Sequence, residues 1–104
     1  MPSIRSIALI AAALAAVLLM VAACEIAPPV QEMSDARQAI AVARDAGAET
    51  HATRELLEAE QHLQTAEREL SAENYAEARR EALAAKSKAQ TARKLSEINQ
   101  PDGE

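Results

Sequence analysis

The spacing of apolar residues divides the chain into an apolar leader and a longer amphipathic part. Residues 7–23 carry no polar side chain, whereas beyond residue 33 the apolar residues recur at intervals of three and four. Such intervals place side chains on one face of an α-helix. The pattern therefore predicts an all-α protein behind an apolar leader.

Two apolar stripes predict a pair of long helices over residues 54–71 and 75–98. Each stripe alternates steps of three and four residues, which is the spacing of a coiled-coil seam. The first stripe consists of Leu56, Ala59, Leu63, Ala66 and Leu70, and the second of Tyr75, Ala78, Ala82, Ala85, Ala89 and Ala92. Thr53 and Asn74 are the candidate N-caps, and Glu77 would complete a capping box with Asn74.

The two stripes would lie on different sides of one continuous helix. The second stripe starts five residues after the first ends, and five steps of about 100° leave the stripes about 140° apart. A chain that folds back at residues 71–74 brings the stripes face to face. Charge favours this pairing, because residues 53–73 carry a net −4 and residues 74–98 a net +3. We therefore predict an antiparallel helical hairpin.

A shorter helix is predicted ahead of the hairpin, over residues 35–46. Ser34 is its candidate N-cap, and Gly47 stands where a C-terminal cap is expected. Its apolar face consists of Ala36, Ala39, Ile40, Ala43 and Ala46. The predicted fold is a short helix followed by an antiparallel, coiled-coil-like hairpin, with the helical domain over residues 34–98.

The segments that flank this domain contain helix-breaking residues. Pro28 and Pro29 favour an extended, semi-rigid linker over residues 24–33. Pro101 and Gly103 predict a disordered tail over residues 99–104.

The leader has the three parts of a secretory signal: a basic start at Arg5, an apolar run, and small residues ahead of the only cysteine. The sequence Val21-Ala22-Ala23-Cys24 resembles the lipobox of bacterial lipoproteins. The resemblance implies that residues 1–23 are a cleavable lipoprotein signal peptide. It also implies that Cys24 begins the mature protein and carries acyl chains, such as palmitate, that hold it to a membrane.

Two other interpretations of the leader remain open. An uncleaved transmembrane helix usually has about 20 apolar residues, and residues 7–23 are near the minimum length. A soluble secreted protein would leave Cys24 as a free thiol, since a lone cysteine cannot form an internal disulfide. Lipidation removes that liability.

Composition limits the partners of the mature chain. Loss of the leader, with its single charge at Arg5, changes the net charge from −5 to −5 − 1 = −6. An acidic chain without a basic, aromatic-rich patch is not expected to bind nucleic acid. Its apolar residues are mostly alanine, so the core buries little area, and self-association into a homo-oligomer would steady it.

No arrangement of residues indicates catalysis or a cofactor. His51 and His62 lie eleven residues apart without the spacing of a metal site, so we expect both on the surface. The glutamates fall on solvated helix faces, whereas acid–base catalysis requires carboxylates in a cleft that excludes water. We expect no enzyme, no metal and no cofactor.

Four segments carry a resemblance to a known family: residues 33–40, 45–48, 55–60 and 70–79. They resemble the small Ala/Glu-rich helical domain of unknown function found in Gram-negative lipoproteins. Some members of that family are fused to a peptidoglycan-binding domain similar to that of outer membrane protein A. The chain departs at the turn, where Ala72-Glu73 stands in place of the glycine common in such turns.

These observations predict a lipid-anchored envelope protein with a structural or protein-interaction role. Glu25 after Cys24, in place of aspartate, favours the outer membrane, facing the periplasm. One alternative is non-covalent peptidoglycan binding, and a second is a small membrane-active lipoprotein. The candidate partner contacts are Tyr75, Arg79, Arg80 and Lys86. Tyr75 could instead anchor the packing of the hairpin turn.

Overall fold

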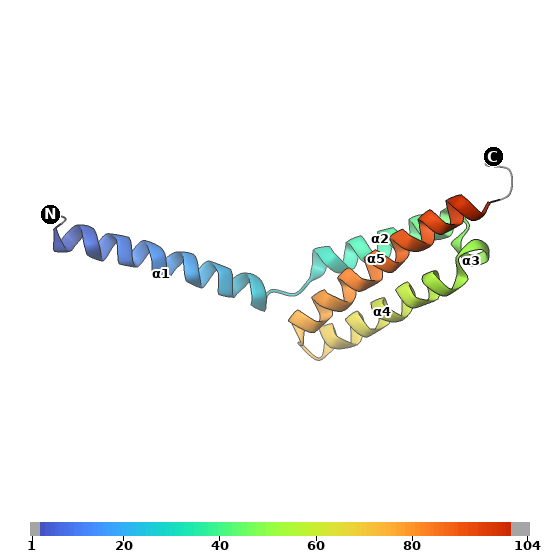
Figure 1. Ribbon diagram of the computed structural model, residues 1–104. Helices are drawn as coiled ribbons and strands as arrows, with labels where there is room; N and C mark the ends of the chain where they lie inside the picture. The colour runs from blue at the N-terminus through green and yellow to red at the C-terminus, as the bar shows by residue number, and fades with distance from the viewer. Residues whose placement is uncertain (1–2, 101–104) are drawn as a thin grey trace.

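The computed structural model describes residues 3–100, and for residues 21–26 it describes the backbone alone. This part of the chain contains five helices and no strand. They are α1 (Ile4–Ile26), α2 (Val30–Asp45), α3 (Ala48–His51), α4 (Thr53–Ser71) and α5 (Tyr75–Asn99), shown in Figure 1. The predicted all-α class is confirmed.

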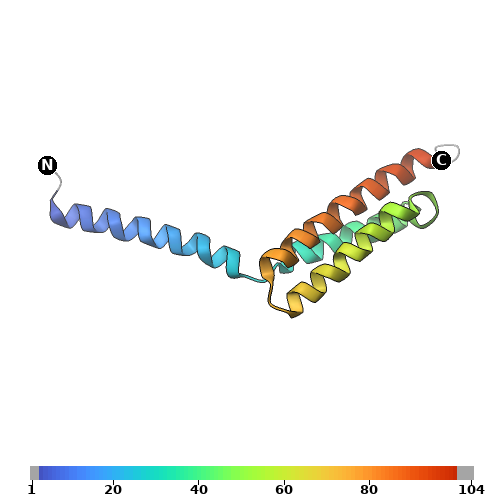
Figure 2. The same ribbon diagram turned by 60° about the horizontal axis from the view of Figure 1, so that its bottom comes forward.

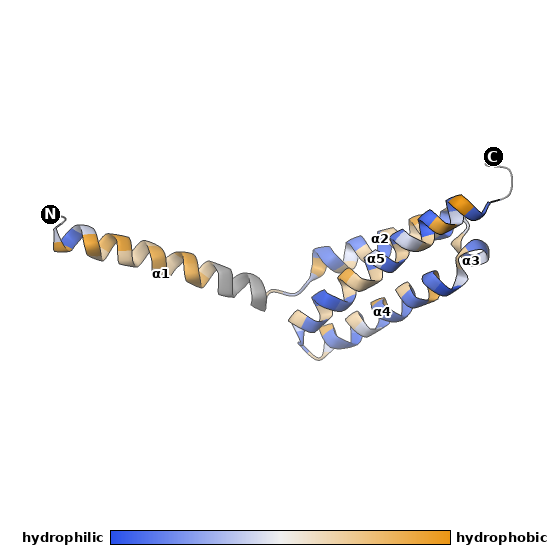
Figure 3. Cartoon of the chain, viewed as in Figure 1, coloured by the Kyte–Doolittle hydropathy of each residue, from blue (hydrophilic) through white to orange (hydrophobic). Residues whose placement is uncertain are grey.

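Helix α1 extends away from the other helices, as Figures 1 and 2 both show. It is the most uniformly hydrophobic segment of the chain (Figure 3). All side chains of residues 3–20 are exposed. Among the residues that the structure describes, no helix combines the length and the apolar character needed to cross a membrane.

Helices α4 and α5 form the predicted antiparallel hairpin, and α2 packs along it (Figure 2). Helix α5 is the central helix because it packs against both α4 and α2, whereas α2 and α4 meet less closely. Its buried positions are Ala78, Ala82, Ala85, Ala89, Ala92 and Ser96. The alanine stripe of the second long helix is buried, as its spacing predicted, and it also forms the centre of the bundle because α2 packs on it.

Alanine dominates the core. Of the fourteen buried hydrophobic residues in the described part, eleven are alanine, and the other three are Met33, Ile40 and Leu56. A methyl side chain lets helix axes approach closely but removes little apolar area from water. The bundle consequently depends on close backbone approach along α5 more than on large side chains.

Helix α2 begins five residues earlier than the predicted start at residue 35. Pro29 is its N-cap residue and is buried, whereas Ser34 lies inside the helix and is exposed. Proline suits the start of a helix because the missing N–H has no intrahelical acceptor there. Met33 is buried in the core, which gives the added turn an apolar contact. The linker expected over 24–33 is reduced to residues 27–29 between helices.

The predicted caps are correct in part. Gly47 follows α2 with a φ of +92°, and its N–H donates to the carbonyl of Arg44, as a C-terminal cap requires. Asn74 is the N-cap residue of α5 but makes no capping bond, since its Nδ2 donates to Glu69 Oε2 at 2.9 Å, so the capping box is wrong. Thr53 is not the N-cap residue of α4 as predicted: it is the first residue of the helix, and Ala52 is the N-cap residue.

The sequence did not predict α3, a single turn between α2 and α4. Helix α5 ends at Asn99, one residue beyond the predicted end, and Gln100 Nε2 donates to the carbonyl of Ala46 at 2.5 Å. Most of the expected disordered tail, residues 101–104, lies outside the described residues.

Candidate functional site

Arg79, in the second turn of α5, connects this helix to the start of α2. Its Nε lies 3.2 Å from Glu32 Oε1, and its Nη2 donates to the carbonyl of Ala27 at 3.0 Å. The side chains of Arg79 and Glu32 are only 27% and 29% exposed. This candidate partner contact is therefore occupied within the chain, where it holds the connector of residues 27–29 against the hairpin.

The other candidate contacts on α5 are dispersed. Tyr75 is half-buried at the helix start, and Arg80 is exposed and pairs with Glu77 one turn earlier. Arg79 contacts α2. Lys86 lies two turns further on and faces Asp35 of α2. The structure does not bring the four predicted residues together into one site.

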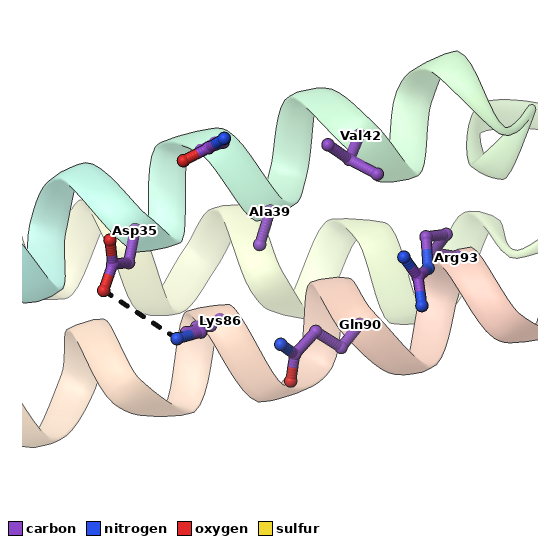
Figure 4. Close-up of a pocket in the computed structure, with 7 residues that line it drawn as sticks. Asp35, Ala39, Val42, Lys86, Gln90 and Arg93 are labelled. Atoms are coloured by element: carbon purple, nitrogen blue, oxygen red, sulfur yellow. Dashed lines mark ion pairs between the residues drawn. The ribbon is translucent and has the colours of Figure 1, made fainter.

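A groove between α2 and α5 contains Lys86 together with residues that the sequence did not single out (Figure 4). Its volume is about 250 Å³, and it is open to solvent. It is lined by Asp35, Gln38, Ala39 and Val42 of α2 and by Lys86, Gln90 and Arg93 of α5. The spacing of Lys86, Gln90 and Arg93 at i, i+4 and i+7 could have indicated a shared face.

The two histidines are less exposed than the sequence suggested. His62 Nδ1 lies 2.6 Å from Glu81 Oε2, which links α4 to α5, and both side chains are partly buried. His51 is also half-buried. Both histidines thus lie at the surface and are partly covered. Within the described residues, no three His, Cys, Asp or Glu side chains gather as metal ligands would.

Ion pairs cross both sides of α4. Arg37 and Arg44 of α2 pair with Glu67 and Glu60 of α4, seven residues apart on each helix. On the other side, Lys88 Nζ of α5 lies 2.7 Å from Glu58 Oε2.

The Lys88 contact, together with the charges of Lys88, Arg54 and His62, lowers the pKa of the Glu58 carboxyl below its ordinary value of 4.5. Partly exposed pairs stabilise weakly and mainly select which helix faces meet.

The lipobox-like segment lies near the end of α1. Val21, Ala22, Ala23 and Cys24 are helical in backbone, and the helix continues to Ile26. The side chains of this segment lie outside the described residues. Lipid attachment at Cys24 thus remains a prediction from the sequence.

The geometry of the described residues defines a small helical bundle with an alanine core, cross-helix ion pairs and a mixed polar groove between α2 and α5. The family model described as "Domain of unknown function (DUF4398)" matches residues 31–101, and the chain belongs to that family. The matched range contains α2 to α5 except for Val30, and it excludes α1. No curated protein and no solved structure matches the chain.

Proposed function

We propose that this chain is a lipid-anchored protein of the bacterial cell envelope, attached through acyl chains on Cys24. Its bundle faces the periplasm, and Glu25 after the cysteine favours attachment to the outer membrane. The bundle has a structural or protein-interaction role without a catalytic step. The buried acyl chains supply the attachment, at about 0.8 kcal/mol per CH₂ group, and two or more chains make it stable.

The separation of α1 from the core is the observation that carries this proposal. Every side chain of residues 3–20 is exposed, and the first buried residue in the described part is Pro29. Cleavage before Cys24 would therefore remove no buried side chain among those described. A removable leader requires this independence from the mature fold, and it adds to the Val21–Cys24 pattern.

The short connector would fix how the bundle sits on its anchor. Only residues 27–29 separate α1 from α2, and Arg79 binds the carbonyl of Ala27. The start of α2 and the α4–α5 turn lie at the same end of the bundle (Figure 1), so both would lie near the membrane. The opposite end, with α3, would point away from it and be accessible to an envelope partner.

Metabolic labelling with a palmitate analogue tests the anchor. The full chain, expressed in a Gram-negative host, should incorporate the label and lose residues 1–23 by mass spectrometry. Cys24→Ala should abolish labelling, whereas the control Ser34→Ala, at an exposed position outside the lipobox, should keep it. Retention of the leader in the mature protein, or labelling of the Cys24→Ala variant, would contradict the proposal.

Cross-linking in intact envelopes tests the interaction role. The lipidated chain should form a defined adduct with another envelope protein or with a second copy of itself. It should also fractionate with the outer membrane. Retention of the purified chain on protein-free sacculi, without such an adduct, would instead support the peptidoglycan-binding alternative.

A further inference from the structure

Tyr75, the only Tyr, Phe or Trp residue of the chain, lies close to the connector that leads to the proposed anchor. It is the first residue of α5 and is half-buried. Arg79 follows one turn later on the same face of the helix, and its Nη2 donates to the carbonyl of Ala27 at 3.0 Å. Helix α1 contacts α5 as well. The start of α5 therefore lies beside the connector, as Figures 1 and 2 both show.

The Arg79 contact limits how far the start of α5 can lie from an acylated Cys24. Ala27 is three residues after Cys24, and three residues span at most about 11 Å when fully extended. Tyr75 lies about 6 Å along the helix axis from Arg79, towards the α4–α5 turn. Acyl chains on Cys24 would hold that residue at the membrane surface. This short connection would then keep the start of α5 close to the lipid headgroups.

The surface at this end of the bundle is apolar and lacks a basic cluster. We call it the turn end and define it by Val30, Ala72, Tyr75 and Ala76. Val30 is 69% exposed, and both alanines are exposed. Tyrosine, with an apolar ring and a polar hydroxyl, concentrates where a membrane meets water. Residues 71–77 contain two glutamates and no Lys or Arg, so attraction to anionic lipid does not contribute here.

We infer that the turn end rests on the lipid headgroups, with the side chains of Tyr75 and Val30 in the interface. The inference deepens the proposed function and rests on the anchor at Cys24. A lipid surface fits this end better than a protein partner does, because the short connector holds the end against the bilayer. The contact orients the bundle and leaves the α3 end accessible.

The fluorescence of Tyr75 tests the inference, because no other Tyr and no Trp contributes to the signal. The lipidated protein, purified from a Gram-negative host, is bound to phosphatidylcholine vesicles with and without lipids brominated near the headgroup end of their acyl chains. The brominated lipids should remove most of the Tyr75 fluorescence. The quenching should persist at high ionic strength, since the contact is not electrostatic.

The matched control carries its fluorophore at the other end of the same helix, in the double variant Tyr75→Leu with Ile98→Tyr. Ile98 is 76% exposed and lies about 35 Å from Tyr75 along α5. Brominated lipids should leave the fluorescence of this variant unchanged. Circular dichroism should confirm that it folds.

Flotation with the vesicles measures the anchor separately from the turn end. A protein that does not float would contradict the anchor and the inference with it. A protein that floats but shows equal quenching at positions 75 and 98 would overturn the inference alone. Shielding of Tyr75 from acrylamide that grows with protein concentration, without quenching by brominated lipid, would place a second copy on this surface and would also overturn the inference.

Discussion

Arg79 of α5 and Glu32 of α2 form a partly buried ion pair, with Nε and Oε1 3.2 Å apart, across 47 positions of sequence. The same guanidinium donates to the carbonyl of Ala27, just ahead of α2. One side chain thereby fixes the start of α2 and its connector to the central helix. The position of the bundle relative to whatever precedes residue 27 depends on this contact.

Replacement of Arg79 should loosen that connection. Arg79→Ala removes hydrogen bonds that involve a charged group, and because the side chains are partly exposed we expect a loss of about 1 kcal/mol in unfolding free energy. Amide hydrogen exchange over residues 30–33 should accelerate. Arg80→Ala is the matched control, since Arg80 is exposed and pairs only within α5, with Glu77. Equal exchange rates in both variants would argue against the role assigned to Arg79.

The alanine stripe should tolerate no larger side chain. Ala89 is fully buried in a cluster that includes Ile40 of α2 and Ala59 of α4. Ala89→Leu should cost about 1–3 kcal/mol, because added methylene groups force apart helices that already touch. Ala76→Leu, at an exposed position of α5, is the control and should change the stability by less than about 0.5 kcal/mol. Urea unfolding measures both, and similar midpoints would refute close packing along α5.

The Glu58–Lys88 pair should make a small contribution to stability that is lost in acid. The folded-state pKa of Glu58 lies below its ordinary value of 4.5, first because Lys88 donates a hydrogen bond to the carboxylate. The contribution is present above the ordinary pKa and disappears as the pH falls through the lowered one. NMR titration of the Glu58 carboxyl should report the lowered pKa, and Lys88→Gln should raise it towards 4.5. An unchanged pKa in the variant would remove Lys88 as the cause.

The hairpin was predictable because its information is local. The spacing of the alanines from Ala78 to Ala92 predicts the buried face of α5, and all five of these alanines are buried. Ser96 continues the same spacing but was not assigned to the core, because it is polar. Its hydroxyl donates to the carbonyl of Ala92 at 2.7 Å, which satisfies the group and permits its burial.

The start of α2 and the occupied contacts were not predictable, because they depend on residues distant in sequence. The pair Pro28-Pro29 indicated a linker, but contacts of Met33 with Ala66 and Ala82 stabilise an additional helical turn. Arg79 and Lys86 looked equivalent as candidate contacts. Only the fold distinguishes them, since Glu32 binds Arg79 closely whereas Asp35 lies farther from Lys86. The spacing of residues within α5 cannot predict how closely a carboxylate of α2 approaches each of these two side chains.

The turn between α4 and α5 contains a strained residue that glycine should relieve. Glu73 has a φ of +62°, in the left-handed region. Its N–H donates to the carbonyl of Leu70, and the N–H of Asn74 donates to that of Glu69. These two bonds form a Schellman motif, in which the position of Glu73 usually holds glycine.

The substitution Glu73→Gly should therefore stabilise the bundle. A left-handed non-glycine residue costs about 1–2 kcal/mol, and the greater freedom of glycine in the unfolded chain offsets about 0.4–1 kcal/mol of that gain. The middle of these two ranges gives a net stabilisation of about 0.8 kcal/mol. Ala72→Gly is the control, because Ala72 has a φ of −84° and no strain to relieve. Glycine at this position only increases the freedom of the unfolded chain, so the variant should be less stable. Thermal and urea unfolding should move the two adjacent variants in opposite directions, and a destabilised Glu73→Gly would show that the turn is not strained.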